Sequence, residues 1–189
     1  MTNSIDSLVW IIRRENDITH VEHRQLAILL TKAYPLYSET YTGLQSWNSA
    51  RPELRVIGKL NGEPIAHLGL LRRFISISER DNDQLVGDVG LVCVDPQERK
   101  RGIGKLLLGH SARLMSELNL PYGFLTCDPK RTSFYEASGW QKLERQFVRM
   151  IDEDQTPQIT HSVAMVLPVS EDLSNWSKGH LIDRNGWEV

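Results

Sequence analysis

Two glycines and three basic residues follow an apolar run near the middle of the chain, and this arrangement is suited to binding an anion. Residues 85–94 are mainly apolar, and Asp95-Pro96 ends the run. The segment 99–104 reads Arg-Lys-Arg-Gly-Ile-Gly, and a helical pattern begins at Lys105. A turn between a strand and a helix N-terminus gathers backbone N–H groups, and the helix dipole favours negative charge there. The spacing matches neither the P-loop nor the dinucleotide fingerprint, so an ordinary basic turn is the alternative.

Two further side chains could transfer protons. Asp88 lies in an otherwise apolar run, where a charge is costly without a partner. It could accept a proton as a general base, or it could orient a substrate amine without proton transfer. Tyr135 is a candidate general acid, because an unperturbed tyrosine titrates at roughly 10 and keeps its proton at neutral pH. Packing in the core is the alternative for Tyr135.

Several other side chains could contact an acceptor. His67 lies on an expected strand, where a single histidine is more often a satisfied core residue than a base. The polar-aromatic stretch 34–52 contains Tyr34, Tyr37, Tyr41 and Trp47. Aromatic rings offer flat, amphipathic contact surface. The stretch could therefore bind a sugar-like molecule, and ordinary loop packing is the equal alternative.

The hydrophobic pattern predicts alternating strands and helices around these residues. We expect strands at residues 8–13, 54–60, 65–77, 85–94, 122–127, 140–150 and 162–169. Helices are expected after a cap at Asp17 or Thr19, and at residues 105–118 and 132–138. Thr19 and Glu22 fit a capping box, Asn61-Gly62 is typical of a type I′ hairpin, and the polar residues 81–83 are expected to turn the chain. The tail 171–189 shows no clear periodicity.

This order of elements predicts a mixed α/β fold, with residues 1–189 as one domain and the tail packed on it. Ligands bind where strand ends meet helix N-termini in such sheets. We therefore expect the functional site around residues 94–104 and the adjacent end of the strand 122–127.

Composition narrows the class of protein. The formal net charge of −2 argues against a nucleic-acid binder, which needs a basic face. No apolar run has the length of a membrane span, and residues 8–12 are too short for a signal sequence and follow Asp6 instead of basic residues. Cys93 and Cys127 lie in expected strands and show no metal-ligand spacing. We expect a cytoplasmic protein with reduced cysteines and no metal.

The pattern Arg99-x-x-Gly102-x-Gly104, the later Tyr135-x-x-x-Gly139-Trp140 and the order of elements resemble the GNAT superfamily of acyl-CoA N-acyltransferases. Residues 50–55, 67–75 and 181–186 are similar to the nodulation protein A acyltransferases. A looser likeness links the His67 hairpin and the Tyr135 motif to aminoglycoside 2′-N-acetyltransferases. Both groups acylate an amine of an amino sugar. The former take a fatty acyl group from acyl carrier protein, and the latter take acetyl from acetyl-CoA.

The resemblance implies a mostly antiparallel sheet with a splayed central strand pair and flanking helices. It also implies that strand backbone pairs with pantetheine and polarises the thioester, and that Tyr135 and Asp88 are catalytic. Asp128 stands where many members have asparagine, and it could contact the donor or begin a turn. The expected donor-binding residues are Leu91, Val92, Cys93, Val94, Arg99, Lys100, Arg101, Gly102, Ile103, Gly104, Lys105 and Asp128. The expected acceptor-binding residues are Tyr34, Tyr37, Tyr41, Trp47 and His67.

We therefore expect an N-acetyltransferase that moves acetyl from acetyl-CoA to a primary amine of a small acceptor, such as an amino sugar or aminoglycoside. The basic turn favours CoA, whose 3′-phosphate needs cationic partners. The first alternative is fatty N-acyl transfer from acyl carrier protein to a chitooligosaccharide amine. The second is a non-catalytic acyl-CoA-binding module. No nucleic acid or membrane partner is expected, and a homodimer remains open.

Overall fold

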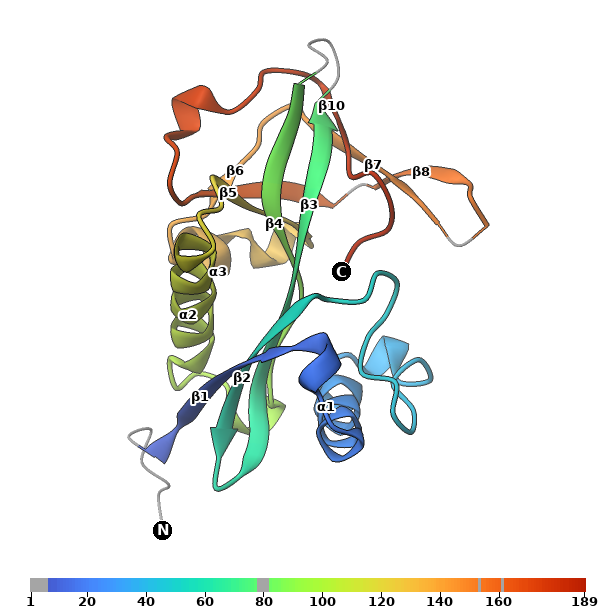
Figure 1. Ribbon diagram of the computed structural model, residues 1–189, viewed down its shortest axis with the longest axis vertical. Helices are drawn as coiled ribbons and strands as arrows, with labels where there is room; N and C mark the ends of the chain where they lie inside the picture. Colours follow the sequence, from blue (N-terminus) through green and yellow to red (C-terminus); the bar gives the residue numbers. More distant parts are fainter. Residues whose placement is uncertain (1–6, 78–81, 153, 161) are drawn as a thin grey trace.

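A long, twisted sheet forms the centre of the computed structural model, which describes residues 7–77, 82–152, 154–160 and 162–189 (Figure 1). The strands are β1 (Val9–Arg14), β2 (Leu54–Leu60), β3 (Glu63–Ile77), β4 (Asn82–Val94), β5 (Tyr122–Cys127), β6 (Gln141–Lys142), β7 (Phe147–Ile151), β8 (Pro157–Thr160), β9 (Val163–Pro168) and β10 (Leu181–Asp183). The α-helices are α1 (His20–Ala33), α2 (Ile103–Glu117) and α3 (Thr132–Glu136). Asp6 and the turn residue Asp81 lie outside the described residues.

The described strands join into one mixed sheet. Its order is β6-β9-β5-β4-β3-β10-β7-β8, with β2 added to β3 and β1 added to β2. Most pairs are antiparallel, whereas β4 pairs with β5 and β10 pairs with β7 in parallel. β3 and β4 are the longest strands and run through the whole molecule (Figure 1). They therefore connect the upper and lower parts of the sheet.

Local sequence signals place the boundaries of several elements as expected. Thr19 caps α1, and the Thr19–Glu22 capping box is complete, which confirms that prediction. Asn61 and Gly62 have φ of 52° and 88°, as a type I′ hairpin turn requires. Asn119 follows α2 with φ of 54°, and Pro121 comes two residues later. Turn chemistry thus fixes the register of β2 and β3 and the end of α2.

The helices α1 and α2 cover opposite faces of the sheet (Figure 1). Leu107, Leu108 and Met115 of α2 pack with alternate residues of β2 and β3, such as Val56 and Leu68. Apolar residues of α1 pack with β4 on the other face. Because strand side chains alternate between faces, the neighbours of these core residues on the strands point toward α1. His67 and Arg55 are among those neighbours.

The C-terminal third differs from the expectation. The single strand predicted at 140–150 is two strands, β6 and β7, which are separated by a turn where Arg145 has φ of 61°. β6 pairs with β9, whereas β7 pairs with β8 and β10. The expected polar loop around Pro157 contains β8, and the tail contributes β10 between β3 and β7. These strands are two to five residues long, which is too short for an alternating pattern to identify them.

None of the helices in the described residues is both long and apolar enough to cross a bilayer. Cys93 and Cys127 are free thiols on β4 and β5. Within the same ranges, no cluster of three histidine, cysteine, aspartate or glutamate side chains could hold a metal ion.

Candidate active site

The two central parallel strands separate toward their C-terminal ends. β4 and β5 pair only from Val86 to Asp88 on β4, opposite Tyr122 to Phe124 on β5. Beyond this point β5 continues beside β9 as far as Cys127, and β4 continues beside β3 as far as Val94. One side of each strand is therefore left without a strand neighbour. This separation is the splay that the family resemblance implied.

A bulge in β4 lies at the start of the splay. The β3–β4 register shifts between His67 and Gly69, and Leu91 has φ of 53°. A left-handed conformation costs a residue with a side chain roughly 1–2 kcal/mol, so surrounding contacts must hold it. The Leu91 carbonyl accepts a hydrogen bond from His67 Nδ1 at 3.1 Å. The next carbonyl, that of Val92, accepts one from the Tyr34 hydroxyl at 2.6 Å.

The basic turn joins β4 to the N-terminus of α2. Gly102 is the N-cap of this helix in a left-handed conformation, with φ of 79°. The first N–H groups of a helix have no carbonyl partner within the helix. Arg99 donates to the Val94 carbonyl, and Arg101 pairs with Glu98. The turn therefore directs unpaired helix N–H groups toward the position where the sequence predicts an anion.

A shallow groove of about 580 Å³ extends from this turn along α2. It is lined by Arg101, Gly102, Lys105, Leu106, Gly109, His110 and Arg113. Within the described ranges, neither Lys100 nor Lys105 is paired with a carboxylate. Two cations at the turn are therefore available to a ligand.

Gly104 lies in the first turn of α2 against the ring of Phe134. A Cβ atom at this position would lie 2.8 Å from Cε2 of Phe134. Phe134 comes from α3, which follows β5, so the two sides of the splay meet here. The absence of a side chain at Gly104 lets the ring and the helix N-terminus approach each other.

Tyr135 of α3 is 8% exposed and packs edge-on against Trp140. Burial raises the pKa of its hydroxyl above the ordinary value, so the group stays protonated at neutral pH. In the described part of the chain, no hydrogen-bond partner occupies this hydroxyl. The Tyr135 ring contacts that of Phe134, which packs on Gly104 at the start of α2, so Tyr135 lies on the α3 side of the splay. The position of the Tyr135 hydroxyl suits a general acid. The packing of its ring also fits the alternative, a tyrosine of the core.

Asp88 is fully buried and is surrounded by two guanidinium groups. Its Oδ2 lies 3.2 Å from Nε of Arg73 and 3.1 Å from Nε of Arg184, and its Oδ1 accepts from Nη2 of Arg184. Burial raises the pKa of the carboxyl, and the two arginines oppose this effect. A protonated Asp88 would leave the buried Arg73 without a counter-charge and would leave Arg184 with Glu188 alone. The arrangement therefore favours an orienting role over proton acceptance.

The C-terminal segment, residues 184–189, crosses the splay beside Asp88. Glu188 binds Thr126 of β5 and Arg184, and its carbonyl accepts from the Ala50 N–H. The backbone of Val189 lies directly on Gly90, where a Cβ atom would come within 1.8 Å of the Val189 carbonyl oxygen. The segment thus connects β4, β5 and the end of the aromatic stretch.

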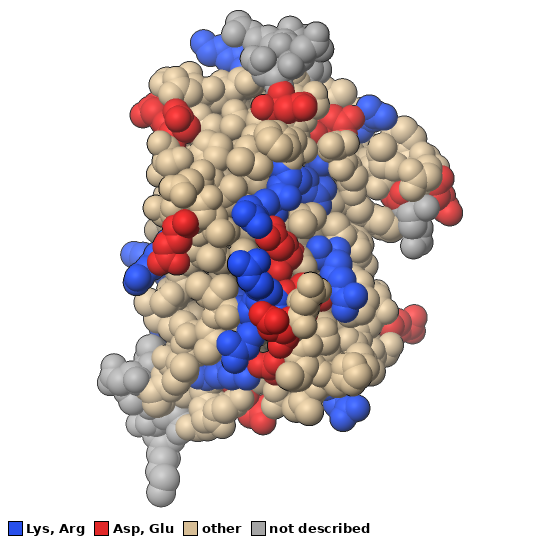
Figure 2. Space-filling model, in the orientation of Figure 1, with Lys and Arg blue, Asp and Glu red and all other residues tan. Residues whose placement is uncertain are grey.

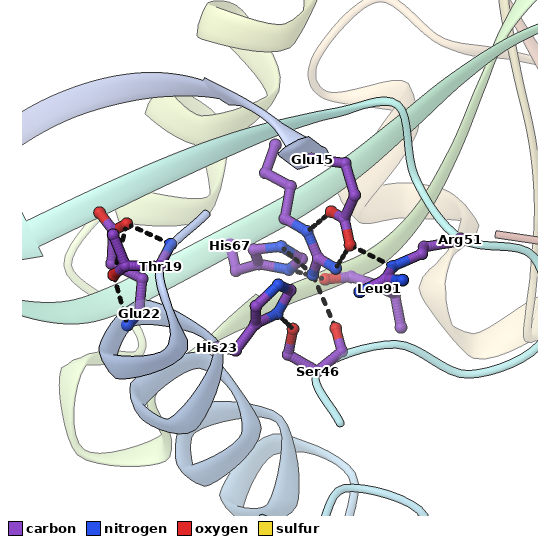
Figure 3. A network of polar contacts seen from close by, with 9 residues as sticks. Glu15, Thr19, Glu22, His23, Ser46, Arg51, His67 and Leu91 are labelled. Atoms are coloured by element: carbon purple, nitrogen blue, oxygen red, sulfur yellow. Dashed lines mark hydrogen bonds and ion pairs between the residues drawn. The ribbon is translucent and has the colours of Figure 1, made fainter. Parts of the chain in front are cut away.

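His67 and the aromatic residues occupy different environments. His67 is fully buried in a polar network (Figure 3), so it lies behind the bulge and not on an open surface. Tyr41 is buried against α1, Tyr37 is 56% exposed, and Trp47 is partly buried under the Arg51 guanidinium. Of the four aromatic side chains in the stretch 34–52, Tyr34 is the one that lies at the splay.

Asp128 lies on the surface after β5. Its Oδ1 accepts from the Lys130 N–H at 2.8 Å and caps a short 3-10 turn. This geometry is that of a turn residue before proline, which was the alternative interpretation.

Sequence reasoning did not single out Arg184, Glu188 or Arg55 as site residues. Arg184 lies 96 positions from Asp88 along the chain, so no local spacing connects them. The one available signal was Asp88 itself, because a buried carboxylate requires a cationic partner from elsewhere.

Figure 2 shows acidic and basic side chains alternating along one face of the molecule. A groove of about 800 Å³ is lined by Ile12, Arg13, Arg14, Asp17, Thr19, Glu22, Glu53, Leu54, Arg72, Leu114, Glu117 and Leu118. Arg72 pairs with Glu53, and Arg13 lies 3.7 Å from Glu22. The opposite charges on this face largely neutralise each other, in contrast to the basic turn before α2.

Comparison with solved structures identifies the fold. A GNAT family N-acetyltransferase from Escherichia coli, solved in complex with CoA, matches with a TM-score of 0.63 and 16% identity over 93% of this chain and 89% of its own. An acyl-CoA N-acyltransferase from Pseudomonas aeruginosa matches with a TM-score of 0.59 and 19% identity over 85% of this chain and 99% of its own. The expectation of a mixed α/β, GNAT-type fold is confirmed.

Sequence comparison identifies the family. The family model described as nodulation protein A matches residues 5–189. Nodulation protein A of Rhizobium tropici is 35% identical, covering 95% of this chain and 97% of the relative. The protein of the same name from Bradyrhizobium elkanii is 34% identical, covering 95% and 91%. The chain is therefore an acyltransferase with the GNAT fold, and it belongs to the nodulation protein A family.

Proposed function

We propose that the protein transfers a fatty acyl group from a phosphopantetheine thioester to the amine of an amino-sugar oligosaccharide. The family match supports this reading over the acetyl transfer that the basic turn first suggested. The observation that carries the proposal is the β4–β5 splay, with the bulge at Leu91 and the basic turn at its end. A phosphopantetheine arm is common to CoA and acyl carrier protein, so the same splay could take either donor.

The donor would be held by backbone and by the basic turn. The arm would lie in the splay, and its phosphate would face the N–H groups at the start of α2. Lys100 and Lys105 pair with no carboxylate among the described residues, and together with the groove along α2 they offer contacts for the rest of the donor. These cations suit the 3′-phosphate of CoA, and they also suit an acidic carrier surface.

In the reaction, the amine nitrogen would attack the thioester carbonyl carbon. The C–N bond forms, the C–S bond breaks, and the thiolate needs a proton while the amine loses one. Tyr135 would supply the proton to the sulfur, because its hydroxyl is protonated and has no partner among the described residues. The proton that the amine loses would return through solvent to the Tyr135 phenolate, so the numbers of protons released and taken up are equal. Asp88, held between Arg73 and Arg184, would shape the acceptor side without taking the proton.

The acceptor would approach from the side of the aromatic stretch. Tyr34 lies at the splay, and the loop that follows it carries Trp47 and ends at the C-terminal segment through Ala50. Sugar rings stack on aromatic side chains, whose faces are apolar and whose polar atoms can still bind hydroxyl groups. Trp47 is the candidate platform on this side.

A donor and acceptor matrix tests the proposal. Acetyl-CoA, palmitoyl-CoA and a palmitoyl carrier protein would be combined with glucosamine oligomers, aminoglycosides, polyamines and a peptide N-terminus. Free thiol release and product mass would be measured for each pair. We expect long-chain donors and glucosamine oligomers to give the highest kcat/KM. Preference for acetyl-CoA would restore the acetyltransferase reading, and preference for a peptide or polyamine would contradict the sugar acceptor.

A further inference from the structure

The bulge in β4 is held by side chains from other elements in place of strand pairing. Leu91 and Val92 lie where the β3–β4 register shifts. The carbonyl of Leu91 is bound by His67, and that of Val92 is bound by Tyr34. In a trans peptide, the C=O and N–H groups point in opposite directions. The contact with His67 therefore directs the N–H of Val92 away from the buried network.

His67 has both ring nitrogens occupied, and this defines its proton position. Nδ1 lies 3.1 Å from the Leu91 carbonyl, so it carries the proton and donates. Nε2 lies 3.3 Å from Nη1 of Arg55, so it accepts. Burial and the nearby Arg55 lower the pKa of His67 to about 3. The ring is therefore a neutral, oriented donor to the bulge at physiological pH.

Arg55 fixes the other side of the ring. It is fully buried on β2, with Nη1 donating to the Ser46 carbonyl at 2.6 Å and Nε donating to Glu15 at 2.7 Å. Ser46 in turn contacts His23 of α1 at 2.8 Å. A guanidinium held at both ends has little freedom to turn. The position of the His67 ring is thus set by β2, α1 and the 3-10 turn Glu15–Asp17 that follows β1.

The network continues to the candidate acceptor platform. Glu15 also accepts from Arg51 at 2.6 Å, and the Arg51 guanidinium lies 3.9 Å from the centre of the Trp47 ring. Burial raises the pKa of Glu15, but the two arginines outweigh it and lower the pKa below its ordinary value. Glu15 therefore remains an anion between them. One chain of contacts links Trp47 to the peptide at Leu91.

We propose that His67 and Arg55 are positioning residues for acyl transfer. They fix the Leu91–Val92 peptide so that its N–H can polarise the donor carbonyl. They also connect this peptide to the loop that carries Trp47. The inference rests on the proposed function, since it requires a thioester donor in the splay. Because His67 and Arg55 are both fully buried, neither can contact a substrate, and their proposed role is to position the peptide that does.

Three variants separate positioning from stability. His67→Leu removes both hydrogen bonds of the ring and fills its place with an apolar side chain. His67→Gln keeps one donor and one acceptor and should restore much of the geometry. Leu68→Ala is the matched control, because Leu68 is the next residue on β3, is equally buried and packs on the α2 face. Circular dichroism would define temperatures at which each variant is folded.

The readouts are kcat, the KM for the donor, and the infrared carbonyl band of bound acetyl-CoA labelled with ¹³C at the thioester carbonyl. We expect His67→Leu to lose most of the band shift seen on binding and to lower kcat by about 10- to 100-fold, the scale of a small misplacement. Its KM for the donor should change little. His67→Gln should recover the shift, and Leu68→Ala should keep both shift and kcat.

An unchanged carbonyl band and kcat in folded His67→Leu would overturn the inference alone. Equal losses in Leu68→Ala would also overturn it, because they would show general loosening of the sheet. Absence of binding of acetyl-CoA, palmitoyl-CoA and a palmitoyl carrier protein by the unmodified protein would instead overturn the proposed function, and the inference with it.

Discussion

At the scale of single residues, buried polar side chains carry the organisation of this site. Arg55, His67, Asp88 and Arg184 are each at most 1% exposed. Burying such groups is costly unless partners satisfy them. All four have partners from distant parts of the chain. Their positions are therefore determined by the whole fold and not by neighbouring sequence.

The neutral state of His67 makes the stability of the protein dependent on pH. Its pKa is about 3 in the folded protein and roughly 6.5 in an unfolded chain. Between these values the unfolded state binds more protons, so the free energy of unfolding rises with pH, by up to about 1.4 kcal/mol per unit. We expect denaturant unfolding to show stability falling from pH 6.5 to 5. The same slope in His67→Gln would contradict this assignment.

Tyr135 provides a test at the reacting atoms. We expect Tyr135→Phe to lower kcat by about 10² to 10⁴, the usual contribution of a positioned acid, with donor affinity nearly unchanged. The ring would keep its packing against Trp140, so the fold should remain intact. Steady-state kinetics and calorimetric titration with the donor measure the two effects separately. An unchanged kcat would leave Tyr135 as a packing residue.

At the scale of elements, the sequence predicted what depends on local patterns. The hairpin at Asn61-Gly62, the cap at Thr19 and the turn before α2 each follow from a few adjacent residues. The division of residues 140–150 into β6 and β7 depends on different partner strands, β9 for one and β8 with β10 for the other. Pairing of this kind is decided by tertiary contacts, which local periodicity does not record.

The N-terminus of α2 supports a prediction about donor binding. Gly104→Val would place a branched side chain against Phe134, since even a Cβ atom would lie 2.8 Å from its ring. Overpacking of this kind costs about 1–3 kcal/mol. We expect the shift of Phe134 and the crowded helix end to weaken donor binding by about tenfold, equal to about 1.4 kcal/mol. Isothermal titration calorimetry measures the change.

Gly109 offers the control for that experiment. It lies in the same helix, and a Cβ atom added there would meet nothing within 4 Å. Gly109 also lines the groove along α2, but its substitution does not crowd the turn, so Gly109→Ala should weaken donor binding much less than Gly104→Val. It should raise stability slightly, because alanine favours helix more than glycine by about 1 kcal/mol. Equal donor affinity in Gly104→Val and Gly109→Ala would show that the turn does not hold the donor.

At the scale of the whole molecule, the C-terminal segment joins parts that the sequence leaves far apart. β10 adds to the sheet between β3 and β7, and the residues after it reach Asp88, Thr126 and Ala50. The similarity of residues 181–186 to the family indicated that this region matters, but no periodic pattern located it. Its position depends on buried ion pairs across the whole fold, and these have no signature in local spacing.

The contact between Gly90 and Val189 provides the test of this connection. Gly90→Ala would place a methyl group within 1.8 Å of the Val189 carbonyl oxygen, so the C-terminal segment must move. We expect a loss of stability of about 1–3 kcal/mol and faster amide exchange at Ala50, whose N–H binds the Glu188 carbonyl. Removing residues 188–189 should also release that amide, and Gly90→Ala should then add little, because the clashing atoms are absent. Two fully additive effects on stability would indicate independent sites, and would contradict the view that packing on Gly90 holds the C-terminal segment in place.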